Sequence, residues 1–426
     1  MTTPTEPLDG AATEPVDRAL AEPTASVSKL WVCWLFVASV GLWSGFFGPI
    51  QVLLAKQSEA ISPDHKETVL ALVTGVGAAV SMVLNPLWGA FSDRTTSRLG
   101  RRLPWVVLGL AGGVVAMLVL SRAGSVWELV LGWALAQGAL NAMLAAITAT
   151  VPDQVPTRQR GAVGGFLAIA QTVGVIAGSG IAAATGSIAA GYFTLMAVLV
   201  LTTLPYVFDS RDIRLPTHLR PRLQWGPFLR GFWVSPRQHP DFGWAWITRF
   251  LMNFGNALLI LYLLYYLTDE LHMTDDEAAN GVFILTAIYG VCTLGTAILG
   301  GLWSDRVGRR KVFVIWSGLI AAAALLLFAL VPTWTAALAA AVILGVGFGA
   351  YTAVDFALIT HVLPAANDRA KDLGVINIAN TLPQVLAPPV AAGMLALDLG
   401  YSAIYMVAAA MSILGSILVV QIRSVD

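Results

Sequence analysis

The stretch that decides the fold is NPLWGAFSDRTTSRLGRRLPW, residues 85–105. An apolar segment ends abruptly in it at Asp93, and several arginines follow before the next apolar segment begins. The chain contains a second version, ILGGLWSDRVGRRKVF, residues 298–313, with Asp305 in the place of Asp93. The fold therefore has to accommodate the same charged connection between two apolar segments twice.

The composition is that of an integral membrane protein. Of 426 residues, 57% are hydrophobic and only 12% are charged, and the mean hydropathy is +0.74. A soluble core could not bury so much apolar surface. Basic and acidic residues balance at 25 each, which indicates no nucleic-acid partner. The sequence contains no His/Cys/Asp metal spacing and no nucleophile motif, so we expect no metal, no cofactor and no enzymatic activity.

Apolar segments long enough to cross a membrane recur along the chain. A helix crosses the hydrocarbon in about 20 residues, and by that measure the sequence predicts twelve transmembrane helices. Their expected limits are 29–56, 67–91, 104–121, 126–150, 161–185, 188–208, 242–268, 278–303, 312–331, 335–361, 371–396 and 400–422. Residues 1–28, which precede them, are rich in Thr, Pro, Glu and Ala and are predicted to form a disordered cytoplasmic tail rather than a signal peptide.

Lysine and arginine predict the orientation. With both termini in the cytoplasm, Lys56, Lys66 and Arg122 face outward, Arg249 lies within a span, and the other basic residues are cytoplasmic. The reverse orientation would invert this ratio, so the positive-inside rule predicts cytoplasmic termini and cytoplasmic SDR loops. The expected location is the plasma membrane, which the protein crosses many times.

One long connection, residues 209–241, divides the spans six and six. We expect a bundle of six helices over residues 29–208, a cytoplasmic or interfacial linker over 209–241, and a second bundle over 242–426. The linker carries six arginines and several aromatic residues. A segment lying at the lipid headgroups is the preferred interpretation. A docking site for a partner is the alternative.

The repeat extends beyond the two loops. GFLAIAQT, residues 165–172, aligns with GVINIANT, residues 374–381, and each follows a turn that contains a proline and an arginine. Two matches in the same order predict a duplicated six-helix unit. Because each unit has an even number of spans, the halves share one orientation and are related by an axis along the membrane normal. A binding site is expected between them near the midplane.

The pattern G-x-x-S-D-R-x-x-x-x-x-G-R-R-x-P, residues 89–104, resembles the loop between helices two and three of major facilitator superfamily transporters. Its long SDR-to-GRR spacing and the stretch GVGFGAYTAVDFALITHVLP, residues 345–364, are most similar to the sucrose–proton symporter and glycoside–pentoside–hexuronide branches. The resemblance covers all twelve spans. It implies an all-α membrane protein of two pseudo-symmetric six-helix bundles, which carries a small molecule by alternating access and acts as a monomer in the bilayer.

The resemblance also implies that the two SDR loops form a cytoplasmic gate. We expect Asp93 to accept hydrogen bonds from the start of a neighbouring helix, and the arginines to bridge to carboxylates or carbonyls. The alternative is that the loops only set the topology, although that role requires no aspartate. The gate residues are Asp93, Arg94, Arg101, Arg102, Asp305, Arg306, Arg309 and Arg310.

Two charged residues lie inside predicted spans. Arg249 is about two turns into the seventh span and Asp355 about two turns from the cytoplasmic end of the tenth, so they are at similar depth. A charge inside a bilayer is costly unless it has a partner, and it indicates a functional site. We predict that the two pair. The alternative is that Arg249 extends to the headgroups and Asp355 bonds locally.

Further candidates for the cavity are amides and aromatic residues at helical spacing. Amides can also hold helices together without any ligand, and aromatic residues are more often packing. These candidates are Gln137, Asn141, Gln171, Asn253, Asn256, Tyr351, Asn377, Asn380, Gln384, Trp43 and Phe47.

The combination predicts a secondary transporter that imports a sugar or glycoside, either alone or together with protons. The first half has no carboxylate within a span, so Asp355 is the remaining buried candidate for carrying a proton. The alternative is an exporter of a drug or small metabolite, although residues 174–186 lack the Gly-Pro element of drug–proton antiporters. A non-transporting receptor or enzyme is a remote third possibility.

Overall fold

The computed structural model describes most of the chain. It covers residues 23–209, 212–220, 226, 237–307, 310–362 and 369–423, and it describes their side chains except at 301–307, 310, 356–362, 369–374, 376 and 377. Most of the predicted tail, residues 1–22, and most of the predicted linker lie outside these ranges. Within them the structure is helical, with one isolated β-bridge between Ser97 and Gly100 and no strand.

The helices before the linker follow the predicted spans closely. The first span is one continuous rod in which the π-helical turn η2 joins α1 to α2, at the position of Pro49. A proline lacks the N–H that an α-helical turn would use, and a π-helical turn accommodates it without a break. The elements are α1 (Lys29–Gly48), η2 (Pro49–Leu53), α2 (Leu54–Ile61), α3 (Lys66–Ser92), α4 (Leu103–Arg122), α5 (Val126–Gln154), α6 (Thr157–Ala184) and α7 (Ile188–Asp209).

The helices after the linker do the same. The first span of this half also contains a π-helical turn, η5, which here lies at the end of the span and carries Asp269. The elements are α9 (Pro240–Tyr265), η5 (Tyr266–Glu270), α10 (Asp275–Val307), α11 (Arg310–Leu330), α12 (Trp334–Val362), α13 (Arg369–Ala396) and α14 (Gly400–Leu418). Within the described residues, eleven segments are long and apolar enough to cross a membrane. The one predicted span that is not among these eleven is α13, the eleventh in chain order, which contains Pro383, Pro388 and Pro389.

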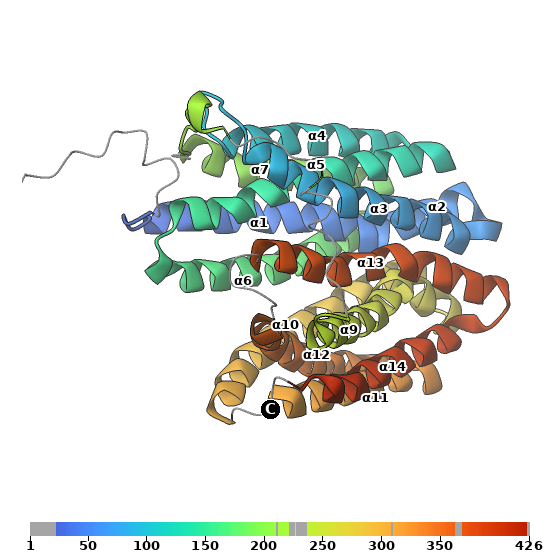
Figure 1. Cartoon of the computed structure of the whole chain (residues 1–426). Coiled ribbons are helices and arrows are strands. Elements are labelled where there is room, and N and C mark those ends of the chain that lie inside the picture. Colours follow the sequence, from blue (N-terminus) through green and yellow to red (C-terminus); the bar gives the residue numbers. More distant parts are fainter. Residues whose placement is uncertain are drawn as a thin grey trace, which may run out of the picture.

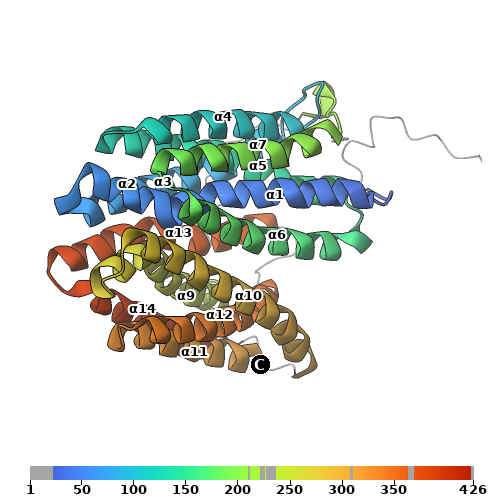
Figure 2. The same cartoon turned by 180° about the vertical axis from the view of Figure 1, so that it is seen from behind.

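The helices form two bundles, one of α1–α7 and one of α9–α14 (Figures 1 and 2). Two helix pairs join the bundles: α3 packs on α13, and α6 packs on α10. In chain order, the first pair joins spans two and eleven, and the second joins spans five and eight. Spans two and eight occupy equivalent positions in the two halves, as do spans five and eleven, so the two pairs are equivalent under the internal symmetry. The predicted fold of two pseudo-symmetric six-helix bundles is confirmed.

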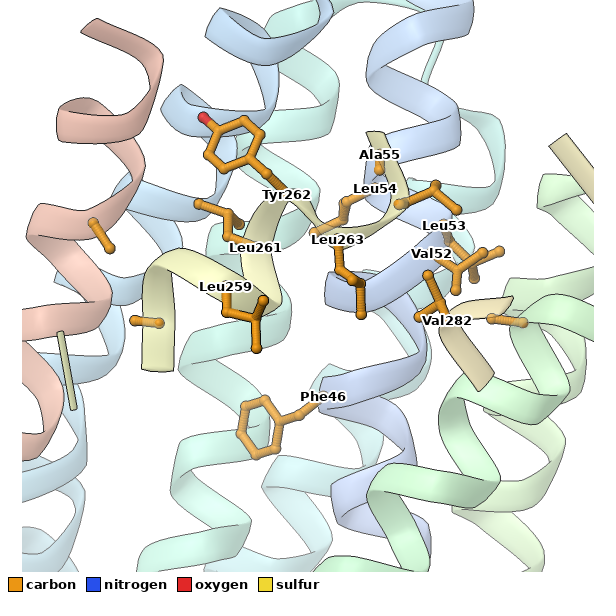
Figure 3. Close-up of a cluster of buried hydrophobic side chains, with 14 of the residues drawn as sticks. Phe46, Val52, Leu53, Leu54, Ala55, Leu259, Leu261, Tyr262, Leu263 and Val282 are labelled. Carbon is orange, nitrogen blue, oxygen red and sulfur yellow. The ribbon is translucent and has the colours of Figure 1, made fainter. Parts of the chain in front are cut away.

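The two ends of the molecule differ in how the bundles meet. We name them the loop end, which carries Asp93, and the Lys66 end, which is the other end of α3. Toward the Lys66 end the bundles share an apolar core, in which Leu263 of α9 lies beside Leu54 and Ala55 of α2 (Figure 3). This core seals the Lys66 end against water and polar solutes.

The joining helix pairs lose contact toward the loop end. A Cβ added to Gly180 or Gly290 would touch the facing helix of the pair α6 and α10, whereas one added to Gly165, nearer the loop end of α6, would meet open space. On α3, Gly75 lies against α13, and a Cβ added to Gly89 would again meet open space. In the described part of the molecule, the bundles are therefore packed at the Lys66 end and apart toward the loop end.

Candidate functional site

The second bundle contains a buried ion pair, about two turns from the loop-end termini of α9 and α12. Arg249 on α9 places Nη2 3.3 Å from Oδ2 of Asp355 on α12, and their side chains are 17% and 9% exposed. Tyr351, one turn before Asp355, donates its hydroxyl to Oδ1 of that carboxylate at 3.0 Å. The predicted pairing of Arg249 with Asp355 is therefore present. It leaves the site neutral overall, as a charge in a membrane interior requires.

Amides extend this pair to a third helix. Asn380 on α13 accepts through Oδ1 from Nε of Arg249 at 2.7 Å and from Nδ2 of Asn253 at 3.2 Å. Asn256, one turn further along α9, accepts from the hydroxyl of Tyr289 on α10 at 3.4 Å. The polar residues that bond here come from α9, α10, α12 and α13, and they include all three members of the predicted stripe on α9: Arg249, Asn253 and Asn256.

The first bundle holds a smaller amide cluster. Asn141 on α5 donates to the carbonyl of Gln137 at 2.8 Å and accepts from Nδ2 of Asn85 on α3 at 2.9 Å. Trp88, one turn beyond Asn85, donates its indole N–H to the carbonyl of Gly138 at 2.8 Å. Sequence reasoning missed Asn85, although an amide one residue before a proline within a span was a usable signal.

The remaining residues that were predicted to line the cavity do not belong to either polar cluster in the described structure. Gln171 and Gln384 are exposed. Trp43 and Phe47 are half-buried with ring centroids 6.0 Å apart, and Phe46 also contacts Trp43. The side chain of Asn377 lies outside the description.

At the loop end, Arg102 connects three helices. It precedes α4, and its guanidinium donates to Asp93 at the end of α3 (Nη2 to Oδ1, 2.6 Å) and to Asp153 on α5 (Nε to Oδ2, 2.6 Å). A third bond reaches the hydroxyl of Ser92 at 2.9 Å. Arg101 adds a second ion pair with Asp153 at 2.5 Å. The first SDR loop is therefore held together by charge-assisted bonds within one bundle.

The carboxylate of Asp93 pairs with Arg102, which is the kind of bridge to a carboxylate that we expected of the arginines. The expected bonds from the first N–H groups of a neighbouring helix to Asp93 stay a prediction. The first N–H groups of α4 bond instead to Asp212, which lies beyond α7. Arg94 donates to the carbonyl of Ala90 on its own helix. Asp305, Arg306, Arg309 and Arg310 of the second loop lie outside the described side chains.

Burial and ion pairing oppose each other at this loop. Burial lowers the pKa of Arg102, but its bonds with Asp153 and Asp93 outweigh that effect, so the pKa lies above its ordinary value. Burial raises the pKa of the Asp212 carboxyl above its ordinary value, although the N–H groups of Leu103 and Arg102 favour the charged form. Arg102 thus remains charged, and the raised pKa lets Asp212 take up a proton at a higher pH than an ordinary aspartate does.

At the Lys66 end, a charged cluster joins the two bundles. Lys66 places Nζ 2.9 Å from Glu59 of the first bundle and 2.9 Å from Asp269 of the second. Tyr401 on α14 bonds to Asp269 at 2.7 Å and to Glu67 at 3.3 Å. Sequence reasoning assigned Lys66 only to the outward-facing charges. It missed this cluster because its members lie far apart in the chain.

Two tyrosines of α9 reinforce the same contact. Tyr265 donates its hydroxyl to the carbonyl of Ala55 on α2 at 2.8 Å, and its ring lies 4.8 Å below the ammonium group of Lys66. Tyr262 lies 3.3 Å from the carbonyl of Glu67. Lys56 and Asp276 form an outer ion pair between the bundles at 3.7 Å. The Lys66 end is therefore closed by polar as well as apolar contacts.

Comparison with known proteins agrees with this geometry. The family model of the Major Facilitator Superfamily matches residues 33–299 and, in a second match, residues 245–425. The chain belongs to the major facilitator superfamily. It is a transporter rather than an enzyme, and it is a multi-pass membrane protein.

The names of curated relatives of this transporter refer to different compounds. The class D tetracycline resistance protein of Salmonella ordonez is 28% identical over 288 residues, which are 65% of this chain and 66% of that protein. The aligned part is thus just under two thirds of that relative. The multidrug resistance protein MdtG of Salmonella typhimurium is 22% identical over 67% of this chain and 69% of its own. The ectoine/proline transporter ProP of Corynebacterium glutamicum is 23% identical over 70% and 65%.

Solved structures match the transporter over nearly its whole length. The crystal structure of a variant of the nucleoside transporter NupG has a TM-score of 0.73 and 14% identity, covering 92% of this chain and 99% of that one. A bacterial homologue of the lysosomal transporter Spinster, in an inward-facing and unoccupied conformation, has a TM-score of 0.62 and 14% identity, covering 93% and 96%. At these identities the matches establish the fold alone.

Proposed function

We propose that this transporter works by alternating access and imports a small, neutral, hydroxyl-rich solute of the sugar or glycoside class. The observation that carries the proposal is the neutral, amide-rich network around Arg249 and Asp355. A cation and an anion that already neutralise each other favour an uncharged ligand. Amides and a tyrosine hydroxyl offer both donors and acceptors to its hydroxyl groups.

The proposed transport site lies between the bundles, with each bundle contributing one polar cluster. Arg249, Asp355 and Asn380 would bind from the second bundle, and Asn85 and Asn141 from the first. The half-buried rings of Trp43 and Phe47 would stack on the apolar face of a sugar. We propose the same role for the other amides named from the sequence, including Asn377, whose side chain is not described.

The proposed cycle uses the two ends of the molecule as gates. The present conformation, packed at the Lys66 end and apart toward the loop end, corresponds to one state of alternating access. We propose that the termini and the loop end are cytoplasmic, in the plasma membrane, as the distribution of basic residues predicts. In that orientation the described state is inward-facing. The protein would act as a monomer, and Asp355 would carry the proton if transport is proton-coupled.

Export of a drug or small metabolite is the second candidate. It is favoured by the two resistance proteins among the relatives. The two candidates differ in the sign of net transport and in ligand chemistry, since drugs of that kind present more apolar surface than a sugar does.

Uptake into proteoliposomes tests the proposal. Radiolabelled sugars and glycosides should accumulate with the wild-type protein and not with Asp355→Asn. The exposed Asp398 provides a matched control, because Asp398→Asn makes the same chemical change outside the site. The proposal of sugar import would give way to drug export if no sugar accumulated, and if cells expressing the protein were resistant to drugs and lost that resistance with Asp355→Asn.

A further inference from the structure

The connection between the two bundles begins with a residue that is bonded to the first SDR loop. Asp212 lies three positions beyond the last residue of α7, Asp209. Its Oδ2 accepts from the backbone N–H groups of Arg102 and Leu103, the latter at 2.7 Å. These are the groups at the start of α4, which have no partner within that helix.

A second bond ties the same two segments together. The backbone N–H of Arg101 donates to the carbonyl of Ile213 at 3.1 Å. Leu215, two residues further, is only 3% exposed. Residues 212–215 of the connection are thus fixed against the loop by hydrogen bonds and by burial.

Gly100 shows that the loop is shaped around Asp212. Its φ is +106°, a conformation that residues with a Cβ rarely adopt. A Cβ built on Gly100 would also collide with the side chain of Asp212. Gly100 therefore allows the contact between the loop and Asp212 in two ways: it adopts the left-handed backbone, and it leaves space for the carboxylate.

The bonded residue is the one that holds the loop together. Arg102 takes the Asp212 bond through its backbone and reaches Asp93 and Asp153 through its guanidinium. The backbone position of Arg102 decides whether one side chain can reach both carboxylates at 2.6 Å. Fixing that backbone also fixes the geometry of both ion pairs.

We propose that Asp212 is a positioning residue of the loop-end gate, which holds Arg102 where its guanidinium can bind Asp93 and Asp153 together. This inference depends on the gating role of the SDR loop in the proposed function. Without Asp212, Arg102 loses its defined position, the contacts that let the loop end close are weakened, and the population shifts toward the conformation open at that end. A helix cap with only a structural role would lower stability without moving this equilibrium.

A cysteine reporter distinguishes the two roles. The native Cys33 and Cys292 are replaced by serine, and Gly165→Cys introduces one thiol on α6, where the described structure is open toward the loop end. Its rate of maleimide labelling reports the population open at that end. Asp212→Ala should raise the rate about two- to tenfold, the range expected from the loss of one cap. Asp212→Asn retains an acceptor oxygen and should label like the wild type.

Ser125→Ala is the matched control, because Ser125 caps α5 of the same bundle away from the loop. It should lower the unfolding temperature and leave the labelling rate unchanged. If Asp212→Ala does not fold, Asp212→Ser can replace it, because serine offers a weaker acceptor. The labelling rate of Asp212→Ser should be higher than that of the wild type and of Asp212→Asn, and lower than the rate expected for Asp212→Ala. Equal labelling of Asp212→Ser, Asp212→Ala and Ser125→Ala at wild-type rates would overturn the inference.

The same reporter separates this inference from the proposed cycle. Lys66→Met, which weakens the opposite end, should lower labelling of Gly165→Cys if the two ends alternate. A response to Lys66→Met without a response to Asp212→Ala rejects only the role of Asp212. No response to either variant rejects alternating access itself, and neither result depends on which solute is carried.

Discussion

Lys66 Nζ lies 2.9 Å from Asp269 Oδ1, although the two residues are 203 positions apart and belong to different bundles. The bond must break whenever the bundles separate at that end. Because Lys66 also binds Glu59 of its own bundle, it can keep one partner during that movement. The pair is therefore one identifiable contact of the closed state of the Lys66 end, beside the apolar core and the tyrosine bonds.

Lys66→Met should open that end. A cysteine at Ala55, whose carbonyl accepts the Tyr265 bond and whose side chain is 1% exposed, provides the reporter. Loss of the pair should raise its labelling by an impermeant maleimide about tenfold, which corresponds to a change of about 1.4 kcal/mol in the balance of conformations. Lys56→Met, which removes a pair with the 91%-exposed Asp276, should change the rate much less. Equal effects of the two variants would contradict the assignment.

The Arg249–Asp355 pair should behave differently in stability and in transport. Asp355→Asn leaves a buried guanidinium without its carboxylate, and the expected loss of stability is roughly 3–5 kcal/mol. Arg249→Gln combined with Asp355→Asn removes both charges and should recover most of that loss in thermal unfolding. Transport should remain absent in the double variant. A double variant that transports normally would show that the pair is only structural.

Asn85 should affect affinity more than stability. It is half-buried and bonds to Asn141 across two helices of the first bundle. If it also bonds the solute, Asn85→Ala should raise the half-saturating concentration about tenfold, the value of one good hydrogen bond. Gln57→Ala is the control: Gln57 bonds to the carbonyls of Leu120 and Ala123, so its loss should lower stability alone. The reverse pattern would make Asn85 a structural amide.

Asp212 should give the stability of the protein a pH dependence. Burial raises the pKa of its carboxyl, so the folded chain holds this proton more tightly than the unfolded chain does. The resulting stabilisation is complete below the unfolded pKa of about 4 and is lost as the pH rises through the folded pKa. Asp212→Asn is neutral throughout and should gain unfolding temperature relative to wild type between about pH 4 and pH 7. A difference that is constant or falls over this range would contradict it.

Much of the fold followed from the sequence because it depends on local patterns. Each span can be predicted from its length and hydropathy, and the repeated SDR loop indicates the duplication. The Arg249–Asp355 pair was predictable for a related reason: a charge within a bilayer needs a partner, and the described spans offer few.

The rest depends on how the bundles meet, which no local pattern encodes. Lys66 and Asp269 are ordinary charges at span ends when read in sequence, and only the packing of α3 against the second bundle pairs them. The sequence does not distinguish Asp212 from the other polar residues of the linker. The available signal was Gly100, directly before two arginines, because a glycine is favoured where the backbone is left-handed or where another group approaches closely.

The central claim is that the network around Arg249 and Asp355 binds the transported solute, and ligand-induced thermal stabilisation tests it most directly. Sugars, glycosides, nucleosides and drugs are screened against the wild-type protein, and the screen is repeated on Arg249→Ala, Asp355→Asn and the control Asp398→Asn. We predict that a sugar-class ligand raises the unfolding temperature of the wild type and of Asp398→Asn, and that both site variants lose this shift. A ligand that shifts all four proteins equally would contradict the claim.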